Sequence, residues 1–144
     1  MKKIIFISLL LFSSLNLIAQ NWLTDFSEAK QIATSENKTI ILVFQGSDWC
    51  APCIKLDREI WSSEEFKTYA EEHYVMLRAD FPRRKKNSLS KEQQSKNNVL
   101  AEKYNKNGYF PLVVILDNKG NRKGELGYEK STPSDFINKI NKLK

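Results

Sequence analysis

The chain has 144 residues, of which 41% are hydrophobic and 28% charged, and its formal net charge at pH 7 is +6. Without Lys2 and Lys3, the 23 basic side chains fall to 21 against 17 acidic ones, a mild positive excess. Most of that excess lies in the run from Arg83 to Lys86, which has no interleaved aromatic residues and no nucleic-acid motif. A nucleic-acid partner is therefore not expected.

The first 19 residues have the three-part pattern of a secretory signal peptide. Lys2 and Lys3 precede a mostly apolar run from Ile4 to Phe12, and Ala19 is a small residue at a suitable cleavage point. Polar residues interrupt the run before the about 20 apolar residues that a transmembrane helix needs. We expect removal of residues 1–19 and no stable membrane insertion afterwards, with an uncleaved N-terminal anchor as the alternative. Residues 20–144 then form one periplasmic or secreted domain.

The hydrophobic pattern of this domain alternates between helix and strand. Apolar residues either recur at helical spacing or form short continuous runs rich in β-branched residues. The predicted elements are, in order, a helix over 26–33, a strand over 39–44, helices over 54–61 and 64–72, a strand over 74–80, a helix over 99–104, strands over 112–116 and 122–127, and a helix over 133–143. Consecutive β-α-β units followed by a hairpin and a helix predict an α/β fold, a central mixed sheet with helices on both faces.

The segment from Pro82 to Asn98 interrupts this alternation. It is too polar for the core, and we expect a long surface loop or a poorly ordered helix there. Its run of like charges is typical of a solvated loop. The segment serves either to dock a partner or as a tolerated insertion.

Both cysteines of the chain lie in S-D-W-C-A-P-C, residues 47–53. Cys50 follows a predicted strand and begins a predicted helix, where free backbone N–H groups and the helix dipole favour thiolate over thiol. The effect fades within the first turn, so Cys50 is the expected nucleophile. Cys53 lies on the same helical face and can attack a mixed disulfide formed at Cys50. Pro52 is tolerated in the first turn, and Trp49 is expected to pack beside the pair.

Three other roles for the cysteine pair are disfavoured. A structural cross-link over about four residues contributes roughly 2 kcal/mol, against about 3 for fifteen residues, so a stabilising disulfide would span more chain. A structural zinc ion needs four ligands, and beside the two cysteines the chain has the lone His73, for which a role at a helix end is expected. Two unrelated reduced thiols would tend to oxidise outside the cell. Redox chemistry without metal or cofactor is therefore expected.

Two segments together resemble the signatures of the thioredoxin superfamily. S-D-W-C-A-P-C after I-I-L-V-F resembles its active-site segment, and G-Y-F-P-L-V-V-I-L-D-N-K-G, residues 108–120, resembles the segment in which a cis-proline opens a strand and faces the disulfide. The resemblance spans roughly residues 24–143. It implies a thioredoxin-like three-layer sandwich with Pro111 as the cis-proline. Gly127 stands where the family tends to keep a glycine.

The resemblance also implies thiol-disulfide exchange with protein disulfide or dithiol substrates. The implied site residues are Cys50 and Cys53 as the redox pair, Trp49, Phe110 and Pro111 at the substrate, and Ala51 and Pro52 as support of the motif. Ala51-Pro52 resembles the reducing members, so disulfide reduction in the cell envelope by a monomer is favoured, with a membrane thiol relay as electron donor. The alternatives are an oxidase or isomerase of secreted proteins and a non-catalytic thioredoxin-fold binding module.

The chain departs from thioredoxins in two places. Thioredoxins proper carry a buried aspartate in the strand before the motif, and Phe44 stands at that position here. The proton acceptor for the second cysteine is left open among Asp48, Asp57, Glu59 and water, each carboxylate being otherwise a solvated surface charge. The second departure is the segment over 82–98, which is longer than the link between strand and helix in thioredoxins.

Overall fold

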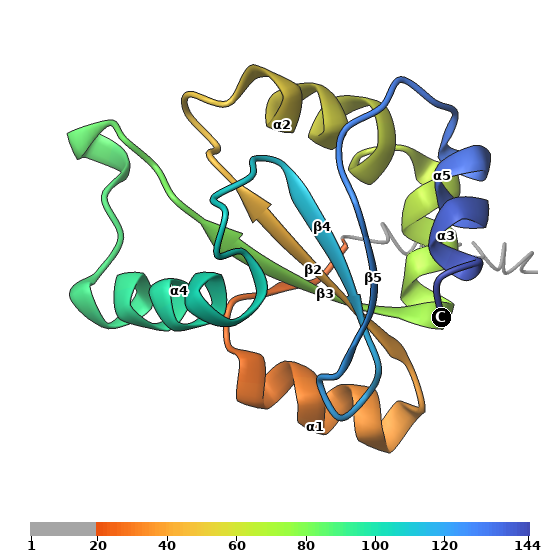
Figure 1. Cartoon of the computed structure of the whole chain (residues 1–144). Helices are drawn as coiled ribbons and strands as arrows, with labels where there is room; N and C mark the ends of the chain where they lie inside the picture. The colour runs from red at the N-terminus through yellow and green to blue at the C-terminus, as the bar shows by residue number, and fades with distance from the viewer. Residues whose placement is uncertain (1–19) are drawn as a thin grey trace, which may run out of the picture.

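A five-stranded sheet, in the order β1-β3-β2-β4-β5, forms the centre of the domain in the computed structural model, which describes residues 20–144 (Figure 1). β1 and β2 run parallel to β3, β4 is antiparallel to β2, and β5 is antiparallel to β4. The strands are β1 (Trp22–Leu23), β2 (Thr39–Gln45), β3 (Tyr74–Asp80), β4 (Leu112–Leu116) and β5 (Arg122–Leu126). The predicted mixed sheet is confirmed, and the predicted signal peptide, residues 1–19, lies outside the described residues.

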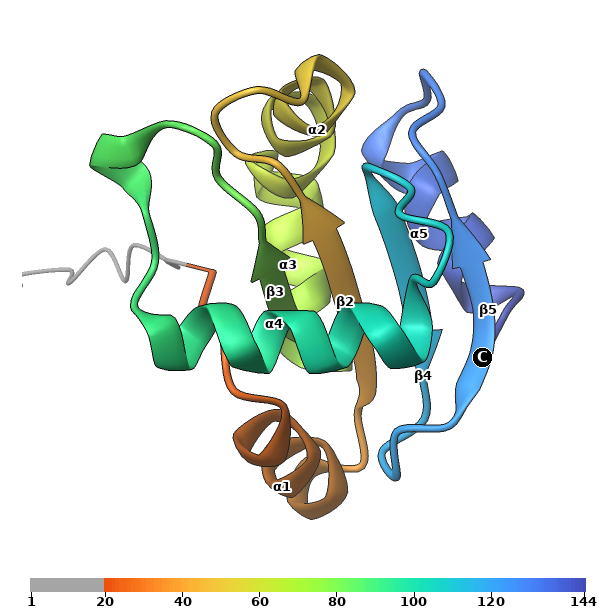
Figure 2. The ribbon, with the colours of Figure 1, turned by 60° about the vertical axis from the view of Figure 1, so that its left-hand side comes forward.

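Helices cover both faces of the sheet, as Figures 1 and 2 show. α1 and α4 pack on one face, and α2, α3 and α5 pack on the other. The helices are α1 (Phe26–Glu36), α2 (Ala51–Leu56) continued by the π-helix η1 (Asp57–Trp61), α3 (Glu64–His73), the 3-10 helix η2 (Lys85–Asn87), α4 (Lys91–Tyr104) and α5 (Pro133–Asn141). This arrangement confirms the three-layer α/β sandwich. Within residues 20–144, no helix has the length and apolarity to cross a bilayer.

Alternate side chains of β2 point to opposite faces of the sheet. Ile40, Leu42 and Phe44 belong to the core beneath α1 and α4, while Ile41 and Val43 belong to the core beneath α2, α3 and α5. All of them are at most 1% exposed, as a strand covered on both faces requires. The carboxyl end of β2 is therefore held firmly at the centre of the domain.

Strand β1 was not predicted, because two residues are too few to show a period. It adds Trp22 to the core beneath α2, α3 and α5, where the ring meets Trp61 edge-on at a centroid distance of 6.0 Å. Trp61 is 1% exposed and also meets the rings of Phe66 and Phe136, at 4.7 and 5.3 Å. The N-terminal strand is thus fixed by aromatic packing as well as by its pairing with β3.

Side chains cap the N-termini of α1 and α3 by accepting hydrogen bonds from backbone N–H groups. Asp25 accepts a hydrogen bond from the Glu28 backbone N–H at 3.0 Å. Ser63 accepts one from the Phe66 backbone N–H at 3.2 Å. Each cap satisfies an N–H group that has no partner within its helix.

Helix α4 begins at Lys91, ahead of the predicted start at Val99. The expectation of a loop or poorly ordered helix over 82–98 is therefore wrong for its second half, which is a regular helix. Ser90 caps it by accepting a hydrogen bond from the Gln93 backbone N–H at 3.1 Å. The first turns of α4 are almost entirely polar, so hydrophobic periodicity does not reveal them.

Two side-chain amides, of which that of Asn97 is buried, hydrogen-bond this polar helix to β3 and to the segment before α1. Asn97 is 1% exposed, and its Nδ2 donates to the Asp80 carbonyl at 2.8 Å. The Gln93 Nε2 donates to Asn97 Oδ1 at 2.9 Å and to the Thr24 carbonyl at 3.0 Å. The N-terminal half of α4 is thus held in place by hydrogen bonds, whereas the other helices are held by apolar contacts.

Replacing Asn97 by alanine is expected to lower the free energy of unfolding by about 1–3 kcal/mol, because the Asp80 carbonyl loses its buried donor. Asn98→Ala is the matched control, since Asn98 is exposed and accepts a bond only from Gln94 on the same helix. Its expected loss is below about 0.5 kcal/mol. Denaturant unfolding measures both, and equal losses would show that the buried amide does not anchor α4.

Candidate active site

Cys50 and Cys53 form a disulfide. They lie where β2 leads into α2, a connection that Figure 1 shows. Their Cα atoms lie 5.2 Å apart. Cys50 is the N-cap residue of α2, and its Sγ accepts a hydrogen bond from the Cys53 backbone N–H at 3.3 Å. In the reduced protein, this donor and the positive end of the helix dipole would stabilise a thiolate at Cys50.

Exposure does not distinguish the two sulfur-bearing residues, since Cys50 is 3% exposed and Cys53 is 4% exposed. Their positions differ instead, because Cys50 precedes the helix and Cys53 lies inside its first turn. Ala51 and Pro52 between them are exposed, and Ile54 is 48% exposed. These three residues give the disulfide an apolar border of the kind found in the centre of protein interfaces.

The turn before Cys50 is closed around Gly46. The Gly46 carbonyl accepts hydrogen bonds from the backbone N–H groups of Trp49 at 3.3 Å and Cys50 at 2.9 Å. A Cβ atom at Gly46 would lie 2.2 Å from Trp49 Cε2, inside the indole ring. Glycine at this position therefore lets the tryptophan fold back over its own turn.

The Trp49 indole is held by three partners. Its Nε1 donates to the Phe81 carbonyl at 2.7 Å. The ring meets that of Phe110 at a centroid distance of 5.5 Å, and the Arg83 guanidinium carbon lies 3.6 Å from the ring centroid on a face. Trp49 thus joins the turn over residues 46–50, called the redox turn below, to Phe110 and to the segment after β3.

The peptide bond between Phe110 and Pro111 is cis, as the resemblance implies. Pro111 is buried and directly precedes β4, whose Leu112 pairs with Phe44 near the end of β2. Because Cys50 follows β2, this antiparallel pairing brings the cis-proline to the same end of the sheet as the disulfide.

The loop that leads to the cis-proline is held by Asn105, which is 5% exposed. Its Nδ2 donates to the Tyr109 carbonyl, and its Oδ1 accepts from the Tyr109 N–H, both at 2.9 Å. Gly108 supplies the positive φ of 67° that this loop needs. Sequence reasoning missed Asn105, because an asparagine in a loop carries no signal of its own.

Phe44 occupies the position of the buried aspartate of thioredoxins, and it is 0% exposed in the core beneath α1 and α4. Among the three carboxylates considered as proton acceptors, Glu59 accepts a hydrogen bond from the Tyr128 hydroxyl at 2.8 Å. Asp57 is exposed and lies about one helical turn beyond Cys53, whose carbonyl accepts the Asp57 backbone N–H. Of the three carboxylates, Asp57 is therefore the one that lies one turn from Cys53 along the same helix.

Asp48, the third of these carboxylates, binds the backbone of the segment that follows β3. Its two oxygens accept hydrogen bonds from the Arg83 N–H at 2.9 Å, the Arg84 N–H at 3.0 Å and the Asn87 Nδ2 at 2.8 Å. The Arg83 N–H is the main cause of the lowered pKa of the Asp48 carboxyl. With three donors on one carboxylate, Asp48 is a tether for the segment after β3.

Asp80 ties the redox turn to β3 from the other side, a role that sequence reasoning did not assign. As the last residue of β3, it accepts hydrogen bonds from the Ser47 N–H at 2.9 Å and the Ser47 hydroxyl at 2.6 Å. The Phe81 N–H donates to the Gln45 carbonyl at 2.9 Å, which extends the pairing of β2 with β3 by one bond. The turn that carries Cys50 is thus braced on both sides.

His73 lies at the last position of α3, and its ring packs on that of Tyr69 at a centroid distance of 4.1 Å. It precedes β3, whereas the redox turn contacts the end of that strand, so the expected helix-terminal position is confirmed. In the part of the chain that the structure describes, no cluster of three or more His, Cys, Asp or Glu side chains could hold a metal ion.

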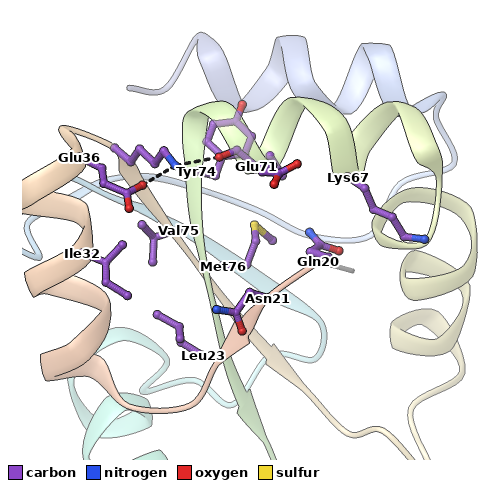
Figure 3. Close-up of a pocket in the computed structure, with 12 residues that line it drawn as sticks. Gln20, Asn21, Leu23, Ile32, Glu36, Lys67, Glu71, Tyr74, Val75 and Met76 are labelled. Atoms are coloured by element: carbon purple, nitrogen blue, oxygen red, sulfur yellow. Dashed lines mark hydrogen bonds and ion pairs between the residues drawn. The ribbon is translucent and has the colours of Figure 1, made fainter. Parts of the chain in front are cut away.

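A cavity of about 330 Å³ opens at the other end of the sheet, beside α1, α3 and the edge strand β1 (Figure 3). Tyr74 to Met76, at the start of β3, line it. Lys38 also lines it, with its Nζ donating to the Glu71 carbonyl at 2.7 Å and pairing with Glu36. The disulfide follows the far end of the seven-residue strand β2, about 20 Å away, so the cavity is not part of the redox site.

The chain belongs to the thioredoxin-like family, whose model matches residues 21–118. Disulfide bond reductase DsbH of Chlamydia pneumoniae is 36% identical over 115 residues, which cover 80% of this chain and 68% of that protein. Thioredoxin-related protein DsbJ of the same organism is 27% identical over 98 residues, which cover 68% of this chain and 27% of that protein.

Solved structures agree with this assignment. A DsbH oxidoreductase superimposes with a TM-score of 0.79 at 34% identity, covering 87% of this chain and 85% of that one. A thioredoxin from Thermus thermophilus, with a TM-score of 0.63 at 16% identity and 85% of each chain covered, shares the fold. With an oxidised C-x-x-C pair at the start of α2, the protein is a thiol-disulfide oxidoreductase of this family.

Replacing Asp48 by alanine is expected to speed tryptic cleavage between residues 83 and 87 several-fold, because the backbone there loses two acceptors. The matched control is Asp117→Ala, since Asp117 accepts N–H groups of Lys119 and Asn121, both at 2.9 Å, in the turn between β4 and β5. This control should leave cleavage between 83 and 87 unchanged. Timed digestion with fragment masses measures both, and equal cleavage in the Asp48 variant and the wild type would disprove the tether.

Proposed function

We propose that this protein reduces disulfide bonds of polypeptide substrates by exchange with the thiols of Cys50 and Cys53. The observation that carries the proposal is the disulfide at the start of α2, at the same end of the sheet as a cis-proline. The 36% identity to a disulfide bond reductase supports reduction as the direction. The Ala51-Pro52 dipeptide, which resembles that of the reducing members, supports it as well.

The proposed reaction has two exchange steps. The Cys50 thiolate attacks one sulfur of the substrate disulfide, which forms a mixed disulfide and releases the other substrate sulfur as a thiolate that takes up a proton. The Cys53 thiolate then attacks Cys50 Sγ, forms the internal disulfide and releases the second substrate sulfur. Two electrons pass to the substrate, and the protein ends in the oxidised state seen in the structure.

The substrate would lie along the segment that begins β4. Phe110 directly precedes the cis-proline and belongs to no strand, which supports pairing of its backbone with an extended substrate. The Phe110 ring and the Trp49 ring meet beside this segment. Within residues 20–144, a Cβ atom added at Gly127 would meet no atom within 4 Å.

Each turnover oxidises the protein, so another dithiol must return two electrons to Cys50 and Cys53. We place the reaction in the cell envelope, after removal of residues 1–19 as a signal peptide from the domain over 20–144, and a membrane-bound thiol relay is the proposed donor. Nothing in the two exchange steps requires a second copy, so a monomer is the proposed form.

Cys53→Ser is expected to accumulate mixed disulfides between Cys50 and substrate proteins, because the second exchange step loses its nucleophile. Nonreducing gels of the periplasmic fraction, followed by mass spectrometry, detect these complexes and test the location at the same time. The control is Cys50→Ser, which should form few complexes because its remaining thiol lies inside the helix. Absence of complexes with Cys53→Ser, or equal amounts with both variants, would contradict the proposed mechanism.

A further inference from the structure

The positive charge of the domain is concentrated in one short segment. Residues 82–91, the basic arm, hold five basic side chains and no acidic one, whereas the rest of residues 20–144 holds 16 basic and 17 acidic side chains. The remainder of the domain is therefore almost neutral. A single charged segment on a neutral surface gives a directed field rather than general solubility.

The basic arm lies beside the redox turn, as Figure 2 shows for the segment between β3 and α4. The Asp48 carboxylate holds the backbone of Arg83 and Arg84, and the Arg83 guanidinium covers the Trp49 ring at 3.6 Å. Asp48 and Trp49 are the two residues before Cys50. The position of the arm is therefore fixed relative to the reactive sulfur.

The charged side chains of the arm are exposed, although the Arg83 guanidinium also covers the Trp49 ring. Residues 83–86 are all exposed, and none of their side chains joins a salt bridge within residues 20–144. The nearby Asp48 carboxylate is occupied by backbone N–H groups of the same arm. Some lysines elsewhere are paired with carboxylates, as Lys96 is with Asp25 at 3.0 Å. The arm thus keeps its charge available to a partner.

A hollow between the arm and α4 offers donors for a carboxylate. It measures about 350 Å³ and is lined by Ser88 and Lys91 of the arm and by Gln94 and Asn98 of α4. Ammonium, amide and hydroxyl groups all donate hydrogen bonds to carboxylates. The arm therefore combines long-range attraction with groups that can bind an acidic side chain directly.

We propose that the basic arm selects substrates in which acidic residues flank the reactive cysteine, a specificity that rests on the proposed reductase function. An extended chain advances about 3.3 Å per residue, so a substrate strand beside Phe110 reaches the arm within about five residues of its cysteine. Arg83 already covers a face of Trp49, which leaves that face closed to stacking nucleic-acid bases. A polypeptide that presents its disulfide to Cys50 meets the arm at the same time.

The test compares synthetic peptide disulfides of equal length, with glutamate, glutamine or lysine around the cysteines, as substrates of the full mature protein. The arm variant carries Lys85→Glu with Lys86→Glu. The charge-matched control carries Lys119→Glu with Lys142→Glu, exposed positions in the turn between β4 and β5 and after α5. Reduction of the glutamine peptide reports on the reductase itself, so its failure would identify a failed function rather than a failed specificity.

At low salt, the wild type should reduce the glutamate peptide with a kcat/KM about tenfold above that of the glutamine peptide. The lysine peptide should be the slowest. The arm variant should lose that preference while reducing the glutamine peptide at the wild-type rate, and the control should keep the preference. High salt should remove the preference, since the Debye length falls from about 30 Å at 0.01 M to about 3 Å at 1 M.

Equal kcat/KM values for the three peptides in the wild type would overturn the proposal, as would an equal loss of preference in the control. The remaining alternative is that the arm binds a membrane, and vesicles with anionic lipid test it. If the wild type binds them, the arm variant does not, and the peptides show no preference, the arm belongs to a membrane contact and the proposal fails.

Discussion

The pairing of β2 with its two neighbours is the constraint on which the redox site depends. Parallel pairing with β3 places Phe81 and Asp80 beside the end of β2, and antiparallel pairing with β4 places the cis-proline at the same end. The two faces of β2 pack in different cores, so a slip of one residue would place its side chains in the wrong core. The chain therefore assembles its reactive turn, its substrate segment and its brace from three distant parts of the sequence.

Specific hydrogen bonds stabilise the redox turn in addition to the burial of its two ends. Asp80 binds Ser47, and Asp48 binds the backbone after β3, so the two carboxylates reach across the same gap in opposite directions. Trp49 adds a third link through the Phe81 carbonyl. A site held by such surrounding contacts keeps its geometry through a reaction cycle in which one covalent bond is made and broken. The same contacts fix the basic arm beside the disulfide.

The sequence predicted those parts of the site that depend on local pattern. The apolar run of β2 and the C-x-x-C motif place Cys50 between a strand and a helix, and the second signature identified the cis-proline correctly. The roles of these residues in substrate binding stay predictions. The start of α4 was missed, because Gln93 and Asn97 anchor it through polar contacts that have no hydrophobic period.

The long-range contacts of the site could not be predicted. Asp48 and Arg83 lie 35 residues apart, and only the paired strands reveal that the two segments meet. From the sequence, Asp48 was therefore as good a candidate for the proton acceptor as Asp57 and Glu59. The structure gives its carboxylate three hydrogen-bond donors and shows that it holds the segment after β3.

The reduction potential of the Cys50 and Cys53 pair tests the central claim most directly. The mature protein would be equilibrated with dithiothreitol or glutathione buffers, and the fraction of disulfide would be measured by thiol alkylation and mass. A potential near that of thioredoxin, about −270 mV, is the predicted result for a reductase. A potential near −120 mV, about the value of a strong disulfide donor, would contradict the account and make the protein an oxidase.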